Sequence, residues 1–171
     1  APNSADAKWT LGLMYLQAGE FKRGWELYEA RWDSKTFGSA RLKTTLPSWE
    51  PDKGYESVLV WCEQGVGDQI LYGAFIKNIY AKKVTAMVDA RLVDLFQRAN
   101  KNVTFIPHDT KLKTSEFDSQ IPLGSLGRYF IDFFNTIPFL EPNPLRTYAM
   151  CAEMGIQDQD FVIGLSWAST A

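Results

Sequence analysis

Cysteine and histidine are scarce in this chain, and it has no long hydrophobic run. Cys62, Cys151 and the single histidine, His108, are too few for a disulfide framework or a zinc cluster, so we expect reduced, buried thiols and no bound metal or cofactor. No apolar run reaches the about 18 residues that a membrane span needs, and no signal peptide opens the chain. We therefore expect a cytoplasmic protein without a membrane span.

An excess of positive charge is also missing. The chain has 18 Lys and Arg against 20 Asp and Glu, a formal net charge of −2, which does not indicate a large basic face for nucleic acid. What is present is apolar: hydrophobic residues make up 46% of the chain and aromatic residues 14%, which is ample for a packed core. Its 171 residues can hold one ordinary domain plus a small appendage.

The stretch Val58–Lys83 carries the clearest pattern. Its first four residues, VLVW, form a continuous apolar run, which is typical of a parallel strand buried on both faces. Gly65 and Gly67 then predict a sharp turn, and a helix with apolar residues at helical spacing follows, reaching Ile79, with Asp68 at its N-cap. Such a turn presents backbone N–H groups at the carboxyl edge of a sheet, where open α/β sheets bind ligands.

The same turn has a purely structural interpretation. Two glycines occur in many βα turns because the turn is tight, and Asp68 on its own is more often a helix cap than a catalytic base. The letters GVGD lack the third glycine of the dinucleotide fingerprint and the GK[ST] of a phosphate loop. The absence of both motifs weakens the possibility that the chain is a nucleotide-binding domain of another kind.

Strands alternate with helices beyond this stretch, which predicts a three-layer α/β fold with a mostly parallel sheet and right-handed crossovers. His108 and Ser125 follow two of the expected strands. His108 either binds an anionic ligand or is a surface loop residue, and Ser125 either hydrogen-bonds a ligand or caps a helix. The expected elements are strands at Val84–Val88, Val103–Ile106, Phe117–Leu123 and Phe161–Trp167, and helices at Ala90–Asn100 and Leu145–Gly155.

Two helices and a polar linker precede the sheet. Helices over Ala7–Gln17 and Phe21–Trp32 have tetratricopeptide spacings, and Gly24 permits a close helix crossing. In the linker, Trp49 lies between two prolines, which is typical of an anchor to a neighbouring surface. The linker is also basic, with Lys35, Arg41 and Lys43, and is either a solvated connector or an anion-binding loop.

Several strings resemble a bacterial family that joins tetratricopeptide repeats to a glycosyltransferase-like domain. WCEQGVGDQILYGAFI resembles its EQG-x-GD segment, and GEFKRGWELYEARW resembles its last repeat. LPSWEPDKGYESVLVW, FDSQIPLGSLGRYF and FVIGLSWAS match further segments in the same order, so that the resemblance covers nearly the whole chain. The domain is similar to the ADP-heptose heptosyltransferases and, more distantly, to the O-linked N-acetylglucosamine transferases.

The resemblance implies the N-terminal half of a GT-B glycosyltransferase with a Rossmann-like sheet, which holds the acceptor while a second half binds the nucleotide-sugar. The implied divisions are a tetratricopeptide-like hairpin (1–33), a linker (34–55), an acceptor-side domain (56–160) and the first strand of a truncated second domain (161–171). The donor-binding residues would lie beyond Ala171, so we expect the fragment alone to be inactive. An apolar edge at 161–167 would then dock on the first sheet or drive self-association.

The implied chemistry is sugar transfer from a nucleotide-sugar donor to a protein or polysaccharide acceptor, without a metal. Asp68 stands where the related heptosyltransferases place a general base, and the neighbouring turn would shape the cleft. The residues that we assign to substrate binding are Glu63, Gln64, Gly65, Val66, Gly67, His108 and Ser125. The alternative is a non-catalytic interaction module that recruits a protein partner through its tetratricopeptide-like helices, with the sheet as scaffold.

Overall fold

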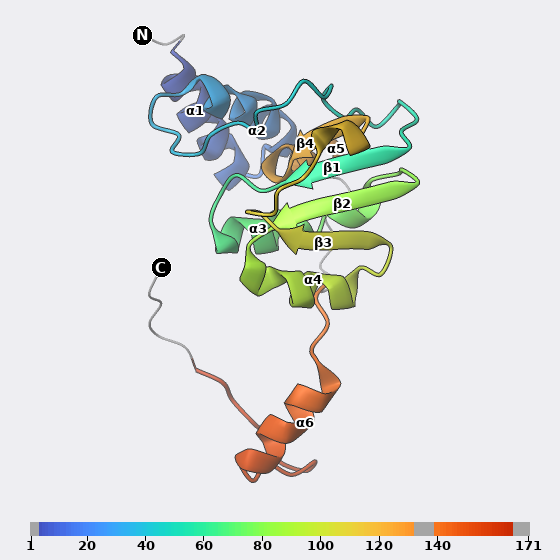
Figure 1. The fold of residues 1–171 in the computed structure, drawn as a ribbon. Helices are drawn as coiled ribbons and strands as arrows, with labels where there is room; N and C mark the ends of the chain where they lie inside the picture. Colours follow the sequence, from blue (N-terminus) through green and yellow to red (C-terminus); the bar gives the residue numbers. More distant parts are fainter. Residues whose placement is uncertain (1–3, 132–138, 166–171) are drawn as a thin grey trace. The chain divides into compact units, whose positions relative to one another are not determined.

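The computed structural model describes residues 4–131 and 139–165. The chain divides into two compact units, Ala1–Leu140 and Glu141–Ala171. The first unit contains a pair of helices, a long loop and a sheet with its helices (Figure 1). Its elements are α1 (Ala5–Gln17), α2 (Phe21–Tyr28), η1 (Glu29–Asp33), β1 (Ser57–Trp61), α3 (Val66–Gly73), η2 (Ile76–Asn78), β2 (Lys83–Val88), η3 (Ala90–Leu92), α4 (Val93–Ala99), β3 (Val103–Pro107), η4 (Thr114–Glu116), β4 (Ser119–Pro122), η5 (Leu123–Leu126) and α5 (Gly127–Phe130).

Four parallel strands form the sheet, in the order β3-β2-β1-β4 (Figure 1). The central strand is β1: Leu59 is paired with Thr85 on β2 and with Gln120 on β4. Because β2 and β3 lie on one side of β1 and β4 on the other, the direction of winding reverses between β1 and β4. The predicted α/β fold with a parallel sheet is confirmed.

The apolar run of β1 is buried on both faces of the sheet, as the sequence predicts. Successive side chains of a strand point to opposite faces. Val58 and Val60 belong to the larger core, together with apolar residues of α3 and α4 such as Phe96. Leu59 and Trp61 belong to a smaller cluster on the other face.

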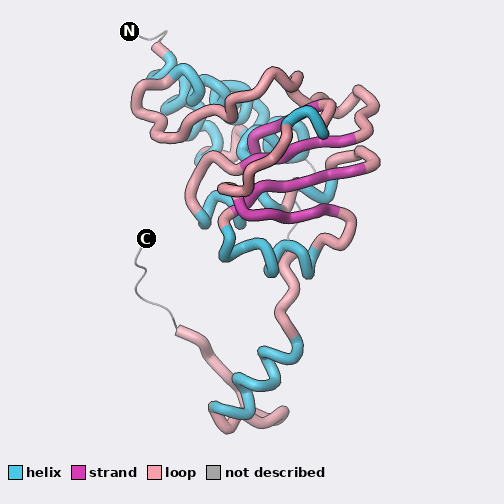
Figure 2. The backbone as a smooth tube through the Cα atoms, viewed as in Figure 1, coloured by secondary structure: helices cyan, strands magenta, loops and turns pink. Residues whose placement is uncertain are grey.

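A long loop, rather than a set of helices, covers much of this second face. The loop between η1 and β1 is drawn in pink in Figure 2. Leu42 and Leu46 from the loop and Trp32 from η1 pack against the smaller cluster. The loop also pairs with the outer edge of β4, because Trp49 N donates to Gln120 O at 2.8 Å. Trp49 itself is almost completely buried in the larger core, which confirms its predicted role as the anchor of the loop.

The helices α1 and α2 form a tightly packed hairpin. A Cβ atom built on Gly24 would lie 2.9 Å from the backbone nitrogen of Leu16, so the close crossing depends on a residue without a side chain, as predicted. The hairpin packs against the sheet region through Trp25, whose ring occupies the space that a side chain at Gly127 would need. Hairpin and sheet therefore belong to one compact unit.

Several helices differ in extent from the prediction. The second helix ends at Tyr28 and continues as the 3₁₀ turn η1 instead of reaching Trp32. The N-cap of α3 is Gly65, so Asp68 occupies the third helical position rather than the cap. The same helix ends at Gly73 instead of near Ile79; glycine has low helix propensity, and a Cβ atom there would lie 2.8 Å from the Phe96 ring.

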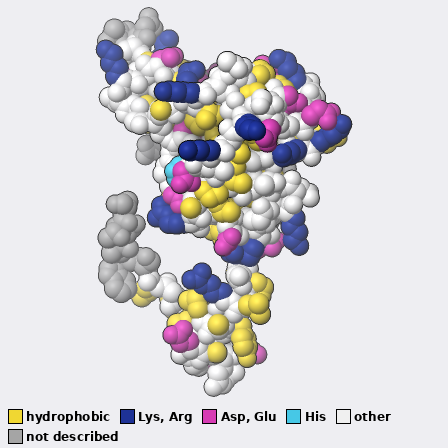
Figure 3. Space-filling view, in the orientation of Figure 1, with side chains coloured by type: hydrophobic (Ala, Val, Ile, Leu, Met, Phe, Trp, Pro, Cys, Tyr) yellow, Lys and Arg dark blue, Asp and Glu magenta, His cyan; other side chains and the backbone are white. Residues whose placement is uncertain are grey.

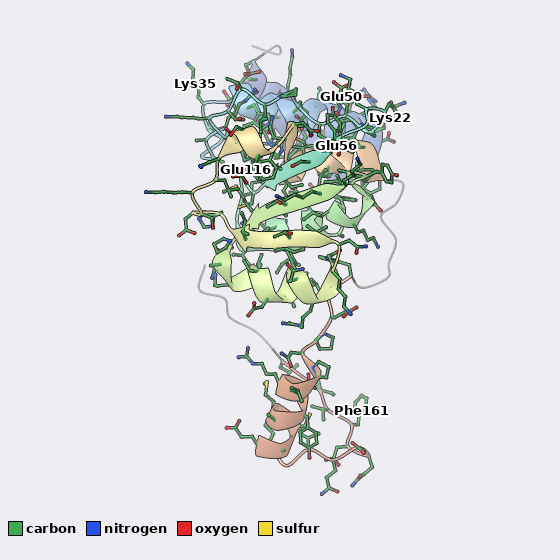
Figure 4. The ribbon with its side chains drawn as sticks, turned by 45° about the vertical axis from the view of Figure 1, so that its right-hand side comes forward. Lys22, Lys35, Glu50, Glu56, Glu116 and Phe161 are labelled. Atoms are coloured by element: carbon green, nitrogen blue, oxygen red, sulfur yellow. The ribbon has the colours of Figure 1, made fainter. Side chains whose placement is uncertain are left out.

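The second unit contains the helix α6 (Pro144–Glu153). Its N-cap is Asn143, whose side chain accepts from Arg146 N at 3.1 Å, and Gly155 follows the helix with a φ of 70°. The expected strand Phe161–Trp167 differs from the structure, since residues 161–165 are not in a strand; 166–167 lie outside the described residues. Phe161 is 90% exposed (Figure 4), and the described residues of the second unit contain no strand that could pair with this segment.

Candidate functional site

A cavity of about 340 Å³ lies beside the ends of β1 and β4, where the direction of winding reverses. Ligands of open α/β sheets bind at this position, because the loops that leave the two strands diverge there. We call it the larger cavity, to distinguish it from the smaller cavity that lies next to it. The residues that line it come from η1, the loop, both strands, η5 and α5: Glu29, Trp32, Arg41, Leu42, Thr44, Ser48, Trp61, Gln120, Ile121, Pro122, Ser125, Arg128 and Tyr129.

Aromatic rings and arginines share the wall of the larger cavity. The rings of Trp32 and Trp61 contact each other, with 5.4 Å between centroids. The Arg41 guanidinium lies 5.2 Å from the Trp32 ring centre, and that of Arg128 lies 5.6 Å from the Tyr129 ring centre. Aromatic faces complement the C–H faces of sugar rings, and guanidinium groups donate to hydroxyl and anionic oxygens.

A smaller cavity of about 240 Å³ lies next to the larger one, at the ends of β1, β2 and β3. The two cavities have Arg41, Leu42 and Trp61 in common. Its remaining lining comprises Ala40, Lys43, Cys62, Met87 and His108. On the face of the first unit that Figure 3 presents, Lys and Arg side chains (dark blue) lie around a band of hydrophobic side chains (yellow).

A buried charged network lies behind the wall of the larger cavity. Arg31 is fully buried; its Nη2 donates to Glu63 Oε1 at 2.9 Å and to Ser125 Oγ at 2.8 Å, and its Nη1 donates to Glu29 Oε1 at 2.7 Å. Ser125 Oγ in turn donates to Glu29 Oε1 at 2.7 Å, and Gly124 N donates to Glu63 Oε1 at 3.0 Å. The network fixes Glu29 and Ser125, which reach the cavity, against the end of the sheet.

Burial dominates the electrostatics of this network. It raises the pKa of the Glu63 carboxyl, while the Arg31 guanidinium and the Gly124 N–H oppose that rise. Burial also raises the pKa of Tyr28, whose ring lies 4.4 Å from the Arg31 guanidinium and whose hydroxyl is hydrogen-bonded to that of Tyr72. The phenol stays neutral, so Arg31 and Glu63 are the charges that must balance each other.

The glycines of the predicted turn are not required by its backbone. Gly65 has a φ of −65°, and neither it nor Gly67 is among the glycines with positive φ. Among the described residues, none comes within 4 Å of a Cβ built on Gly67, and only Asp68 Oδ2, at 3.6 Å, approaches one on Gly65. The start of α3 therefore stays open around Gly65 and Gly67, and Asp68 is partly exposed there.

The other predicted residues fall into two groups. His108 and Ser125 reach a cavity: His108 lines the smaller one and Ser125 the larger one. The Glu63 carboxyl instead faces Arg31 and Gly124, and the buried Gln64 side-chain oxygen has no hydrogen-bond partner among the described residues. That these residues contact a substrate stays a prediction, as does the role of Asp68, which does not line either cavity.

Sequence patterns gave no reason to select several residues that organise the site. Gln69 donates from Nε2 to Gln64 O at 2.9 Å and accepts from Asp89 N at 2.8 Å, and so ties the turn after β1 to the turn after β2. The sequence pattern around Arg31 predicts only an ordinary polar residue of an amphipathic helix. Its partner Ser125 is 94 residues away along the chain, so no local spacing indicates the contact.

Comparisons of this chain with protein-family models, with curated proteins and with solved structures find no match. Within ranges 4–131 and 139–165, no group of three or more His, Cys, Asp or Glu side chains could hold a metal ion. In the part of the chain that the structure describes, no helix is both long enough and apolar enough to cross a membrane. The function has to be inferred from the geometry of the cavities and from the resemblance of the sequence strings.

Proposed function

We propose that the chain is the acceptor-binding, Rossmann-like half of a glycosyltransferase of the GT-B type, preceded by a tetratricopeptide-like hairpin. The observation that carries the proposal is the larger cavity at the reversal of winding. Its aromatic rings, Trp32, Trp61 and Tyr129, suit the faces of a sugar, and its polar groups, Gln120 and Arg128, suit the hydroxyl oxygens. Trp61 Nε1 donates to Gln120 Oε1 at 2.6 Å, which fixes the orientation of both side chains before a ligand arrives.

The proposed reaction transfers a sugar from a nucleotide-sugar to a hydroxyl of a protein or polysaccharide acceptor. The acceptor oxygen attacks the anomeric carbon, the bond from that carbon to the diphosphate oxygen breaks, and a general base takes the hydroxyl proton. We assign the base role to Asp68 on the resemblance of EQGVGD to the heptosyltransferase turn. The open first turn of α3 supports this assignment, since the chain itself does not fill the space beside Gly67.

Acceptor binding is tested with the 171-residue chain. Saturation-transfer NMR with N-acetylglucosamine, galactose and glucose should detect binding of at least one sugar, and Arg128→Ala should weaken it by about fivefold to tenfold, because one charged donor is lost. Lys101→Ala removes an equally exposed cation just before β3, at the opposite end of the sheet, and should leave binding unchanged. Equal weakening by both variants would contradict the assignment of this cavity.

Catalysis is tested with the longest natural chain that contains this sequence, supplied with common nucleotide-sugars. Asp68→Asn keeps the size of the side chain but removes the base, and should lower turnover by roughly a hundredfold or more. Unchanged turnover would leave Asp68 with the structural role of favouring the start of α3 through its negative charge, which contributes about 0.3–1 kcal/mol.

One observation favours the alternative of a non-catalytic interaction module. An apolar groove of about 370 Å³ lies between the hairpin and α3, and three of its wall residues, Leu13, Phe21 and Leu71, are 43–50% exposed. A protein partner with an apolar helix would suit such a groove. Binding of none of the sugars, together with no turnover by the longer chain, would favour this alternative.

A further inference from the structure

The smaller cavity collects positively charged and hydrogen-bond-donating side chains from segments far apart in the sequence. Arg41 and Lys43 come from the loop before β1, and His108 immediately follows β3. His108 N donates to Val88 O at 2.7 Å, which holds the start of this segment beside the end of β2. Trp61 and Met87 line the same cavity and supply apolar surface. The cavity thus combines hydrogen-bond donors with apolar side chains.

The Asp89 carboxylate, which interacts electrostatically with His108, is already paired with Arg91. Asp89 accepts from Arg91 Nε at 2.9 Å and from Arg91 Nη2 at 3.0 Å, so the two side chains neutralise each other. Hydrogen bonds from Arg91 lower the pKa of Asp89 to about 2, so that the pair stays ionised over the ordinary pH range. The charge that Arg41 and Lys43 bring to the cavity remains uncompensated by Asp89.

Among the described residues, neither Arg41 nor Lys43 forms a strong ion pair with a carboxylate. Arg41 Nη2 lies 4.0 Å from Asp33 Oδ1, and both side chains are largely exposed, so solvent screens this pair. Lys43 has no ion pair with any residue that the structure describes. Two cations and an imidazole that line one cavity without strong carboxylate partners are the chemistry that recognises a phosphoryl group.

We propose that the smaller cavity binds a phosphoryl group, held between Arg41, Lys43 and His108. A volume of about 240 Å³ exceeds what one phosphate fills, and the apolar surface of Trp61 and Met87 suits a ring that carries the phosphate. Because Arg41 and Trp61 also line the larger cavity, the same ligand can extend from one cavity into the other. Only this last step rests on the proposed function; the phosphoryl site itself does not.

The single histidine makes the test specific. The protein has one imidazole, so its NMR resonances report on this site alone. Inorganic phosphate and glucose 1-phosphate, titrated at constant ionic strength and pH with chloride as the exchanged ion, should shift the His108 resonances in a saturable manner. Uncharged glucose should leave them in place, and glucuronate distinguishes a phosphoryl site from a general anion site. A shift with glucuronate equal to that with glucose 1-phosphate would overturn the phosphoryl assignment.

Alanine variants test whether Arg41 and Lys43 form the phosphoryl site. Arg41→Ala and Lys43→Ala should each weaken phosphate binding by about fivefold to tenfold, because each removes one charged donor from an exposed position. Lys101→Ala is the matched control and should bind as the parent does. Phosphate binding that is unchanged in the Arg41→Ala/Lys43→Ala double variant, or phosphate that leaves the His108 resonances unmoved, would overturn the proposal.

The outcomes also separate this proposal from glycosyl transfer. Phosphate binding at His108 without binding of any sugar would support the phosphoryl site and contradict the proposed function. Sugar binding that depends on Arg128, with His108 resonances that do not respond to phosphate, would support the proposed function and contradict the phosphoryl site.

Discussion

The Arg31 guanidinium lies 2.9 Å from Glu63 Oε1, and this contact joins the end of the helical hairpin to the end of the central strand. The Arg31 side chain is 0% exposed and that of Glu63 is 1% exposed. Removing two charges from water is costly, and the cost is offset only when close partners replace the water. Here Ser125, Glu29 and Gly124 supply further partners, whereas the buried Arg31 Nε has none among the described residues. The hairpin is thereby part of the site rather than a separate appendage.

Replacing Arg31 by Ala should destabilise the first unit by about 3–5 kcal/mol, because Glu63 would remain buried without its counter-charge. Urea unfolding followed by tryptophan fluorescence measures the change. The control is Lys53→Ala, which breaks an exposed ion pair with Glu50 and should cost less than about 1 kcal/mol. The double variant Arg31→Met/Glu63→Gln should recover part of the loss, and a cost of Arg31→Ala below that of the control would contradict the prediction.

Two glycine substitutions should have opposite effects. A Cβ on Gly124 would lie 2.5 Å from Glu63 Oε1, so Gly124→Ala should lower the free energy of unfolding by about 1–3 kcal/mol. Gly67→Ala meets no described atom within 4 Å and lies in the first turn of α3, so it should be neutral or stabilise by up to about 1 kcal/mol. The same unfolding experiment serves both, and equal destabilisation would show that the Glu63 contact is not the cause.

The two cysteines should differ in reactivity. Burial raises the pKa of the Cys62 thiol from 9.0 to about 11, and a rise of this size reduces the thiolate fraction at pH 8 by roughly a hundredfold. We expect two phases of modification by a chromogenic disulfide reagent, with Cys62 as the slow one. Cys62→Ser should remove the slow phase and Cys151→Ser the fast one. Loss of the fast phase in Cys62→Ser would reverse the assignment.

Asp89 should make stability depend on pH in acid. The folded-state pKa is lowered from 3.8 to about 2, chiefly by hydrogen bonds from Arg91, so the folded protein binds this proton less readily than the unfolded chain does. The stabilisation is therefore complete well above pH 3.8 and is lost as the pH falls through about 2. The melting temperatures of the parent and of Asp89→Asn should differ at pH 6 and converge near pH 2. A difference that is the same at both pH values would contradict this origin.

The central strand could be predicted because it is a short apolar run that must be buried wherever it lies. VLVW of β1 has no polar face to present to solvent, and both of its faces are covered. The cap of α3 was harder to predict, because Gly65 and Asp68 are both acceptable at a helix start and only packing selects between them. The prediction of a strand at 161–165 was wrong although the residues there are mostly apolar. Apolar residues favour a strand, but a strand also needs a neighbour to complete its backbone hydrogen bonds.

The sequence by itself determined the α/β class, the parallel strands, the anchoring of the loop by Trp49 and the close helix crossing at Gly24, because these depend on local apolar patterns and residue size. Only the tertiary structure decided which polar residues meet. The order β3-β2-β1-β4 brings the end of β4 beside the end of β1, and so places Gly124 against Glu63 and Ser125 against Arg31. Such contacts join residues tens of positions apart, and their energies depend on burial, which no local spacing encodes.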